Sequence, residues 1–133
     1  MENTQSKQKI LVVEDDLPVL RALVDKLTRE GFSVLQAKDG AEGLAVALRD
    51  RPDLILLDIV MPIMDGLTVM KKLRAENEWS KKVPVIFLTN LSPDAEEINK
   101  SITEDEPAYY LMKANWSMAD VIEKVRERLN RKV

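Results

Sequence analysis

The sequence predicts a doubly wound α/β domain, in which a parallel β-sheet carries helices on both faces. Short continuous apolar runs, typical of strands buried on both sides, alternate along the chain with longer segments whose apolar residues recur at helical spacing. Glycine, proline and helix-capping residues stand between these segments, where turns are needed. Strands and helices that alternate in this way build parallel sheets through right-handed crossovers.

Five segments are predicted to be strands. The continuous apolar runs at 10–13, 54–57, 85–88 and 109–112 fit strands that are covered on both faces. The run at 33–37 is more mixed, with polar residues among the apolar ones, and this predicts a strand at the edge of the sheet.

Five segments between or after these strands are predicted to be helices. Apolar stripes at helical spacing occur at 20–27, 41–48, 67–73 and 118–129. The segment 94–103 has a thinner stripe, so we expect a short and weakly held helix there. Asp16 and Asp65 are expected to cap the first and third helices. Gly43 lies inside the second helix and is expected to weaken it slightly.

The composition fits one globular domain and excludes several kinds of chemistry. The chain has 133 residues, of which 45% are hydrophobic and 32% charged, enough for a core and a charged surface. It has no cysteine and no histidine, which excludes disulfide scaffolds, the usual zinc sites and catalytic triads. Its net charge of −3 argues against direct binding of nucleic acid. Without an apolar run of membrane-spanning length or a signal peptide, a cytoplasmic protein is expected.

Acidic residues gather at the predicted carboxyl edge of the sheet, where open parallel sheets bind ligands. Glu14 and Asp15 follow the first strand, and Asp58 follows the third. Thr89 closes the fourth strand, and Lys113 follows the fifth. Clustered carboxylates repel one another and need a cation, and oxygen ligands select a hard ion such as Mg²⁺. A carboxylate beside Mg²⁺, with a lysine and a hydroxyl nearby, can attack a phosphoryl group.

Four motifs occur in order along the chain. The most specific is D-I-V-M-P-I-M-D-G at 58–66, and the others are L-V-V-E-D-D at 11–16, F-L-T at 87–89 and Y-L-M-K at 110–113. Together they resemble the receiver domain of two-component response regulators, the CheY-like family, from residue 9 to about 128. The resemblance implies a (βα)5 flavodoxin-like three-layer sandwich with strand order 2-1-3-4-5. We expect residues 1–8 to be a flexible tail and 9–130 to form a single receiver domain.

The resemblance also implies the roles of the residues at the acidic edge. Asp58 would accept a phosphoryl group from a sensor histidine kinase or a histidine phosphotransfer protein. Asp15, Asp58 and the backbone carbonyl of Val60 would bind Mg²⁺ directly, and Glu14 would act through water. Lys113 would contact the phosphoryl group.

The same resemblance implies a switch. Thr89 would follow the phosphoryl group and let Tyr110 swing inward. This movement would change the surface shared by 94–103, 109–112 and 117–129, where an unknown downstream protein would bind. The chain would be a signalling phosphoacceptor that catalyses only its own phosphorylation and dephosphorylation. It would be a monomer or a phosphorylation-dependent dimer, with no membrane or nucleic acid partner of its own.

Two other functions compete with this interpretation. One is a receiver-like binding module that does not depend on phosphate. The complete set of residues at the edge argues against it, because a pure scaffold needs none of them. The other is a phosphatase of the haloacid dehalogenase type, in which an aspartate nucleophile is followed two residues later by a second aspartate as general acid. Val60 occupies that position here, which makes the phosphatase a poor candidate.

Overall fold

Five strands form one parallel sheet in the computed structural model, which describes residues 7–89, 108–112 and 117–130. The strands are β1 (Lys9–Val13), β2 (Ser33–Ala37), β3 (Leu54–Asp58), β4 (Val85–Thr89) and β5 (Ala108–Met112). Their order is β2-β1-β3-β4-β5, and each neighbouring pair is parallel. The predicted fold class and strand order are confirmed, including the edge position of β2.

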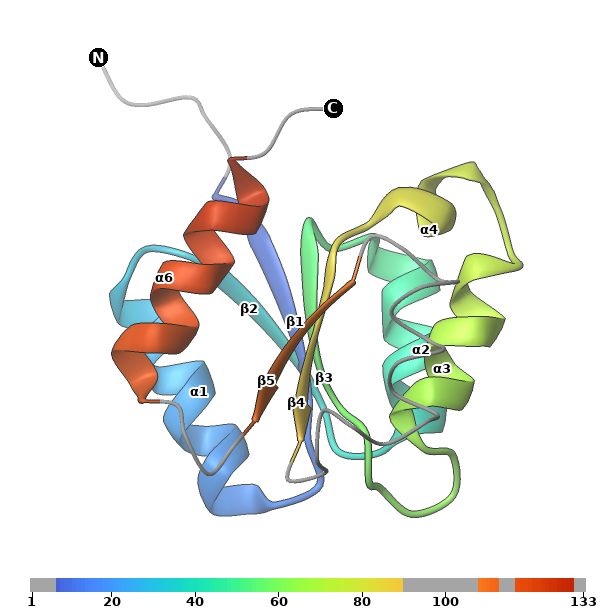
Figure 1. Cartoon of the computed structure of the whole chain (residues 1–133), viewed down its shortest axis with the longest axis horizontal. Helices are drawn as coiled ribbons and strands as arrows, with labels where there is room; N and C mark the ends of the chain where they lie inside the picture. The colour runs from blue at the N-terminus through green and yellow to red at the C-terminus, as the bar shows by residue number, and fades with distance from the viewer. Residues whose placement is uncertain (1–6, 90–107, 113–116, 131–133) are drawn as a thin grey trace.

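Helices cover both faces of this sheet and make the fold a three-layer sandwich. They are α1 (Leu17–Arg29), α2 (Gly40–Asp50), α3 (Gly66–Arg74), α4 (Glu78–Lys82) and α6 (Met118–Leu129). α1 and α6 lie on one face of the sheet, and α2 and α3 lie on the other (Figure 1). None of the helices in the described ranges is both long and apolar enough to cross a membrane. The predicted helix at 94–103 lies outside the described residues.

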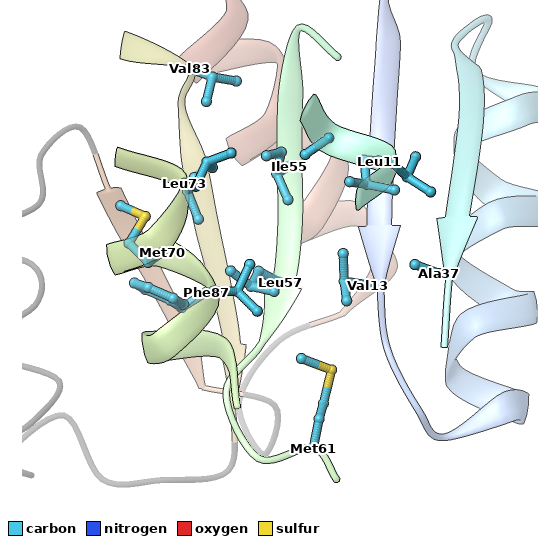
Figure 2. Close-up of a cluster of buried hydrophobic side chains, with 14 of the residues drawn as sticks. Leu11, Val13, Ala37, Ile55, Leu57, Met61, Met70, Leu73, Val83 and Phe87 are labelled. Atoms are coloured by element: carbon cyan, nitrogen blue, oxygen red, sulfur yellow. The ribbon is translucent and has the colours of Figure 1, made fainter. Parts of the chain in front are cut away.

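The inner strands are buried on both faces because their side chains alternate between two cores. Leu11 and Val13 of β1 belong to the core under α2 and α3, and the intervening Ile10 and Val12 belong to the core under α1 and α6. The same alternation occurs in β3 and β4. Figure 2 shows part of the first core, which continues down to Met61 beyond the end of β3. This two-sided burial explains the continuous apolar runs of the sequence.

The helix starts agree with the predicted caps. The carboxylate of Asp16 accepts a hydrogen bond from the Val19 N–H at 3.3 Å at the start of α1. The carboxylate of Asp65 accepts one from the Thr68 N–H at 2.8 Å at the start of α3. Both carboxylates therefore bind otherwise unpaired backbone N–H groups of a first helical turn.

The structure adds one helix that the apolar spacing did not predict. α4 begins after Asn77, whose side chain accepts a hydrogen bond from the Ser80 N–H at 2.8 Å, while Ser80 Oγ accepts one from the Asn77 N–H at 3.0 Å. Arg74 Nη1 donates to the Ser80 carbonyl at 2.7 Å and ties α4 to the end of α3. The reciprocal cap was visible in the sequence as N-x-x-S, but five residues are too few to show an apolar stripe.

Gly43 has a packing role that its low helix propensity did not indicate. A methyl group at this position would lie 2.8 Å from both Cγ atoms of Val13. α2 can therefore approach the end of β1 this closely only with glycine there. Gly43 thus allows contact between α2 and a strand that leads into the acidic edge.

Candidate functional site

The register of the two central strands brings the acidic residues together. Val13 of β1 pairs with Leu57 of β3, so the next residues, Glu14 and Asp58, reach the same edge of the sheet. Asp15 follows Glu14, and one carboxylate oxygen from each of these three residues lies within 4.8 Å of the others. The predicted juxtaposition of the three acids is therefore present.

The surroundings of the three carboxylates differ. Glu14 and Asp58 are buried, with 1% and 5% of their surfaces exposed, whereas Asp15 faces solvent. The Glu14 N–H donates to the Ala37 carbonyl at 3.0 Å, and Glu14 Oε2 accepts from the Asp16 N–H at 3.1 Å. These bonds fix the turn after β1. Two buried carboxylates and an exposed one give an all-oxygen set of ligands, which suits a hard divalent cation such as Mg²⁺.

The segment 59–65, between Asp58 and α3, has a fixed and strained shape. The Met64 N–H donates to the Pro62 carbonyl at 2.7 Å, which closes a three-residue turn around Ile63. Ile63 has φ 73°, a region that β-branched residues rarely adopt. Met61 is buried, and in Figure 2 its side chain is directed toward Leu57 and Val13. The segment that carries Val60 is therefore anchored beside Asp58.

Gly66 completes this segment at the start of α3. Its N–H donates to the Ile59 carbonyl at 2.8 Å. A methyl group at Gly66 would overlap the carbonyl oxygen of Asp58 and lie 2.9 Å from the Ile59 Cα. This contact with the backbone of Asp58 was not among the predictions, although the D-G pair of the motif was its signal.

The structure places two of the other predicted residues in the sheet and leaves one outside the described ranges. Thr89 is the last residue of β4 and follows Leu88, which pairs with Asp58, so its backbone reaches the same edge. Tyr110 lies in β5 and pairs with Phe87. Lys113 lies outside the described residues. The functional roles of these residues remain predictions.

Exposed apolar residues also follow the acids of this edge in the chain. Within the part of the chain that the structure describes, the exposed large hydrophobic residues are Leu17, Val60 and Ile63, with 41%, 61% and 81% of their surfaces accessible to solvent. Leu17 begins α1 just after the acids of β1, and the other two follow Asp58. Sequence reasoning missed this feature, because the sequence alone does not show which apolar residues of a loop are covered. The surface around the acids is therefore partly apolar.

Comparison with known proteins identifies the family. The model of the response regulator receiver domain matches residues 10–126. The chain belongs to this family. Relatives of this receiver include the probable transcriptional regulator ycf27 of Porphyridium aerugineum, 40% identical over 92 residues, and the response regulator PleD of Caulobacter vibrioides, 44% identical over 90 residues. These matches cover 69% and 68% of the receiver, but only 37% of ycf27 and 20% of PleD.

Solved structures agree with this assignment. A CheY-like receiver domain protein from Methanospirillum hungatei superimposes with a TM-score of 0.83 at 30% identity, over 94% of this chain and 95% of that one. The CheX–CheY–BeF₃–Mg²⁺ complex from Borrelia burgdorferi gives a TM-score of 0.80 at 25% identity, over 93% and 90%. The receiver therefore shares its fold with CheY-like proteins over nearly its whole length.

Proposed function

We propose that this receiver accepts a phosphoryl group on Asp58 from a phosphohistidine, in a step that depends on Mg²⁺. The donor is a sensor histidine kinase or a histidine phosphotransfer protein. The observation that carries the proposal is the group of three carboxylates within 4.8 Å of one another at the carboxyl edge of a receiver sheet, with Asp58 at its buried side. The receiver is thus a signalling phosphoacceptor that acts on itself.

In the proposed step, the phosphoryl group is transferred in line from an imidazole nitrogen of the donor to the carboxylate of Asp58. An oxygen of the Asp58 carboxylate attacks the phosphorus atom, and a P–O bond forms as the P–N bond to the imidazole breaks. The released imidazole keeps the electron pair of the P–N bond and takes up a proton from solvent. Lys113 and Thr89 would hold oxygens of the transferred group, Lys113 by charge and Thr89 by a hydrogen bond. No oxidant or reductant is involved.

Mg²⁺ fits the ligands that surround Asp58. Asp15, Asp58 and the carbonyl of Val60 would hold the ion directly, and Glu14 would hold it through water. When bound, the ion offsets the charges of the carboxylates and of the phosphoryl oxygens, so that they can approach each other. The Borrelia CheY complex contains Mg²⁺ together with BeF₃, which supports this assignment for a similar fold.

A protein donor agrees with the surface around Asp58. Leu17, Val60 and Ile63 expose apolar side chains beside the acids. Apolar surface exposed beside a site marks interaction surfaces on soluble domains, and these residues follow the acids closely in the chain. A docking protein can cover these residues while it brings its phosphohistidine to Asp58, whereas a small phosphodonor needs no such surface.

The output would leave through the surface shared by 94–103, β5 and α6. Phosphorylation adds about −1.5 to −2 charges at Asp58. Thr89 would move toward this charge, and Tyr110 would turn inward from the surface. A downstream protein in the cytoplasm would read the changed surface, and neither nucleic acid nor membrane would bind this domain directly.

Intact-mass spectrometry tests the proposal. The wild-type chain, incubated with Mg²⁺ and either a small acyl phosphate or a phosphorylated histidine phosphotransfer protein, should gain one phosphoryl group. Asp58→Asn should gain none. Asp65→Asn is the matched control, because it changes the other aspartate of the motif at 58–66 while asparagine still caps α3. Phosphorylation of Asp58→Asn would contradict the site, and an unmodified wild type would favour a phosphate-independent binding module.

A further inference from the structure

The first turn of α2 packs directly against the segment that follows Asp58. Gly40 opens α2 after its cap Asp39, whose carboxylate accepts a hydrogen bond from the Glu42 N–H at 2.8 Å. A methyl group at Gly40 would overlap the carbonyl oxygen of Met64 and lie 2.9 Å from Cγ2 of Val69. The backbone of α2 therefore touches the backbone of segment 59–65 at a point where no side chain fits.

Segment 59–65 needs such support from its neighbours. Ile63 is held at φ 73° although its own side chain is 81% exposed and gains little from packing. A strained backbone conformation persists only when the surrounding structure holds it. On this segment the support comes from buried Met61, from the hydrogen bond between Met64 and Pro62, and from Gly40 behind Met64. Gly40 is therefore one of a few fixed points of the segment.

The same side of α2 also contacts the strand that carries the other acids. Gly43 follows Gly40 by three residues, so the two lie on one face of the helix. Gly43 approaches Val13, the residue before Glu14. α2 thus lies against the backbone of Met64 and the side chain of Val13, and so packs on both segments that meet at the acidic edge.

We propose that Gly40 is a positioning residue for the Mg²⁺ site. This proposal rests on the function proposed above. By admitting the Met64 carbonyl, Gly40 lets α2 hold segment 59–65 in the shape that presents the Val60 carbonyl beside Asp15 and Asp58. A side chain at position 40 displaces Met64. Because the Gly66 N–H donates to the Ile59 carbonyl and holds the two ends of the segment together, the displacement falls on the residues between Ile59 and Met64, which include Val60. The carbonyl ligand then moves relative to the carboxylates.

Two measurements test this role. One is a titration of the purified chain with Mg²⁺, monitored by NMR. The other is the initial rate of phosphorylation by an acyl phosphate at saturating Mg²⁺. Gly40→Ala should bind Mg²⁺ at least tenfold more weakly than the wild type. Ala47→Val is the matched control, because it adds bulk to a buried position of the same helix away from segment 59–65. The control should bind Mg²⁺ within twofold of the wild type even if its melting temperature falls equally. Wild-type affinity in folded Gly40→Ala would overturn the proposal.

A second pair of variants decides the question if Gly40→Ala does not fold. Asp39→Ala removes the cap that fixes the first turn of α2 without adding bulk, and Ala47→Gly weakens the same helix at its other end. Asp39→Ala should weaken Mg²⁺ binding at least threefold relative to Ala47→Gly, and equal affinities would overturn the proposal. The wild type, measured in parallel, separates the two hypotheses. Failure of the wild type to bind Mg²⁺ or to be phosphorylated contradicts the proposed function, whereas unchanged variants contradict only the role of Gly40.

Discussion

Glu14 and Asp58 lie side by side because each directly follows one member of a registered pair, Val13 of β1 and Leu57 of β3. The two central strands thus fix two of the three carboxylates, and both are buried. Asp15, one residue further along, is exposed and completes the group. Because the sheet holds the two buried carboxylates in place, Asp15 is the acid that can be substituted without disturbing the core.

Asp15→Asn should weaken Mg²⁺ binding while stabilising the metal-free protein. The variant loses one charged oxygen ligand, so we expect at least a tenfold loss of affinity, equivalent to about 1.4 kcal/mol. Without metal it also loses repulsion between carboxylates within 4.8 Å, which amounts to up to about 1 kcal/mol in water. Thermal unfolding with and without Mg²⁺ should show a higher melting temperature for the variant without metal and a smaller rise with metal. Equal rises in the two proteins would contradict the role of Asp15.

Ile63→Gly should raise the free energy of unfolding. A non-glycine residue at positive φ costs about 1–2 kcal/mol, and glycine removes this cost. Glycine also makes the unfolded chain more flexible, which lowers the free energy of unfolding by about 0.4–1 kcal/mol. The expected net gain in the free energy of unfolding is up to about 1.6 kcal/mol, measured by chemical denaturation without Mg²⁺. Val60→Gly is the control, because Val60 is also exposed in the same segment but is not at positive φ. This control should lose stability, and a loss in Ile63→Gly as well would mean that the turn is not strained.

Ile63→Asn should separate the two kinds of phosphodonor. Asparagine tolerates positive φ, so the turn is kept while the exposed apolar side chain is lost. The rate of phosphorylation by a phosphohistidine protein should fall at least fivefold more than the rate with an acyl phosphate. Lys71→Gln, at an exposed position of α3, serves as the control for surface changes in general. If both donors slowed to the same extent in Ile63→Asn, docking on this residue would be excluded.

Much of the fold and the core of the site could be predicted from the sequence, because their signals are local. A strand buried on both faces leaves a continuous apolar run, and the five predicted runs match the five strands to within one residue at either end. Acids that follow two neighbouring strands must meet at one edge. Glu14, Asp15 and Asp58 could therefore be grouped from the predicted parallel sheet, and the family resemblance added the strand order and the roles of these residues.

Two of the features that were missed depend on contacts between distant segments, and a third is too short to show a pattern. In the sequence Gly40 looks like a turn residue and Gly43 like a weak helix residue, and only the packing of α2 against Met64 and Val13 shows why glycine is needed. The α4 helix has a cap but no apolar stripe, since it is only five residues long. Such close approaches follow from how elements pack, and no spacing along the chain encodes them.

One further long-range contact joins α6 to the turn after α1 and leads to a pH-dependent prediction. Arg126 Nη2 donates to Glu30 Oε1 at 2.6 Å, across 96 residues of chain, and its guanidinium lies 5.3 Å from the centre of the Phe32 ring. The hydrogen bond from Arg126, helped by Lys26, lowers the pKa of Glu30 below its ordinary value of 4.5. The Glu30 carboxyl group therefore binds Arg126 most strongly while it is ionised, and the Glu30 backbone carbonyl accepts a second hydrogen bond from Arg126 Nη2 at 3.4 Å.

Arg126→Gln should raise the pKa of Glu30 toward 4.5, as followed by carbon NMR of its carboxyl group. Because the folded pKa is lowered, the ionic stabilisation is fully present above about pH 4.5 and is lost as the pH falls through the folded value. The difference in melting temperature between wild type and variant should therefore be larger at neutral pH than at about pH 3, where the contact with Phe32 remains. Arg29→Gln breaks a separate exposed ion pair with Asp25 on α1 and should leave the pKa of Glu30 unchanged. A difference in melting temperature that did not vary with pH would assign the stabilisation to the contact with Phe32 and the bond to the Glu30 carbonyl rather than to the ion pair.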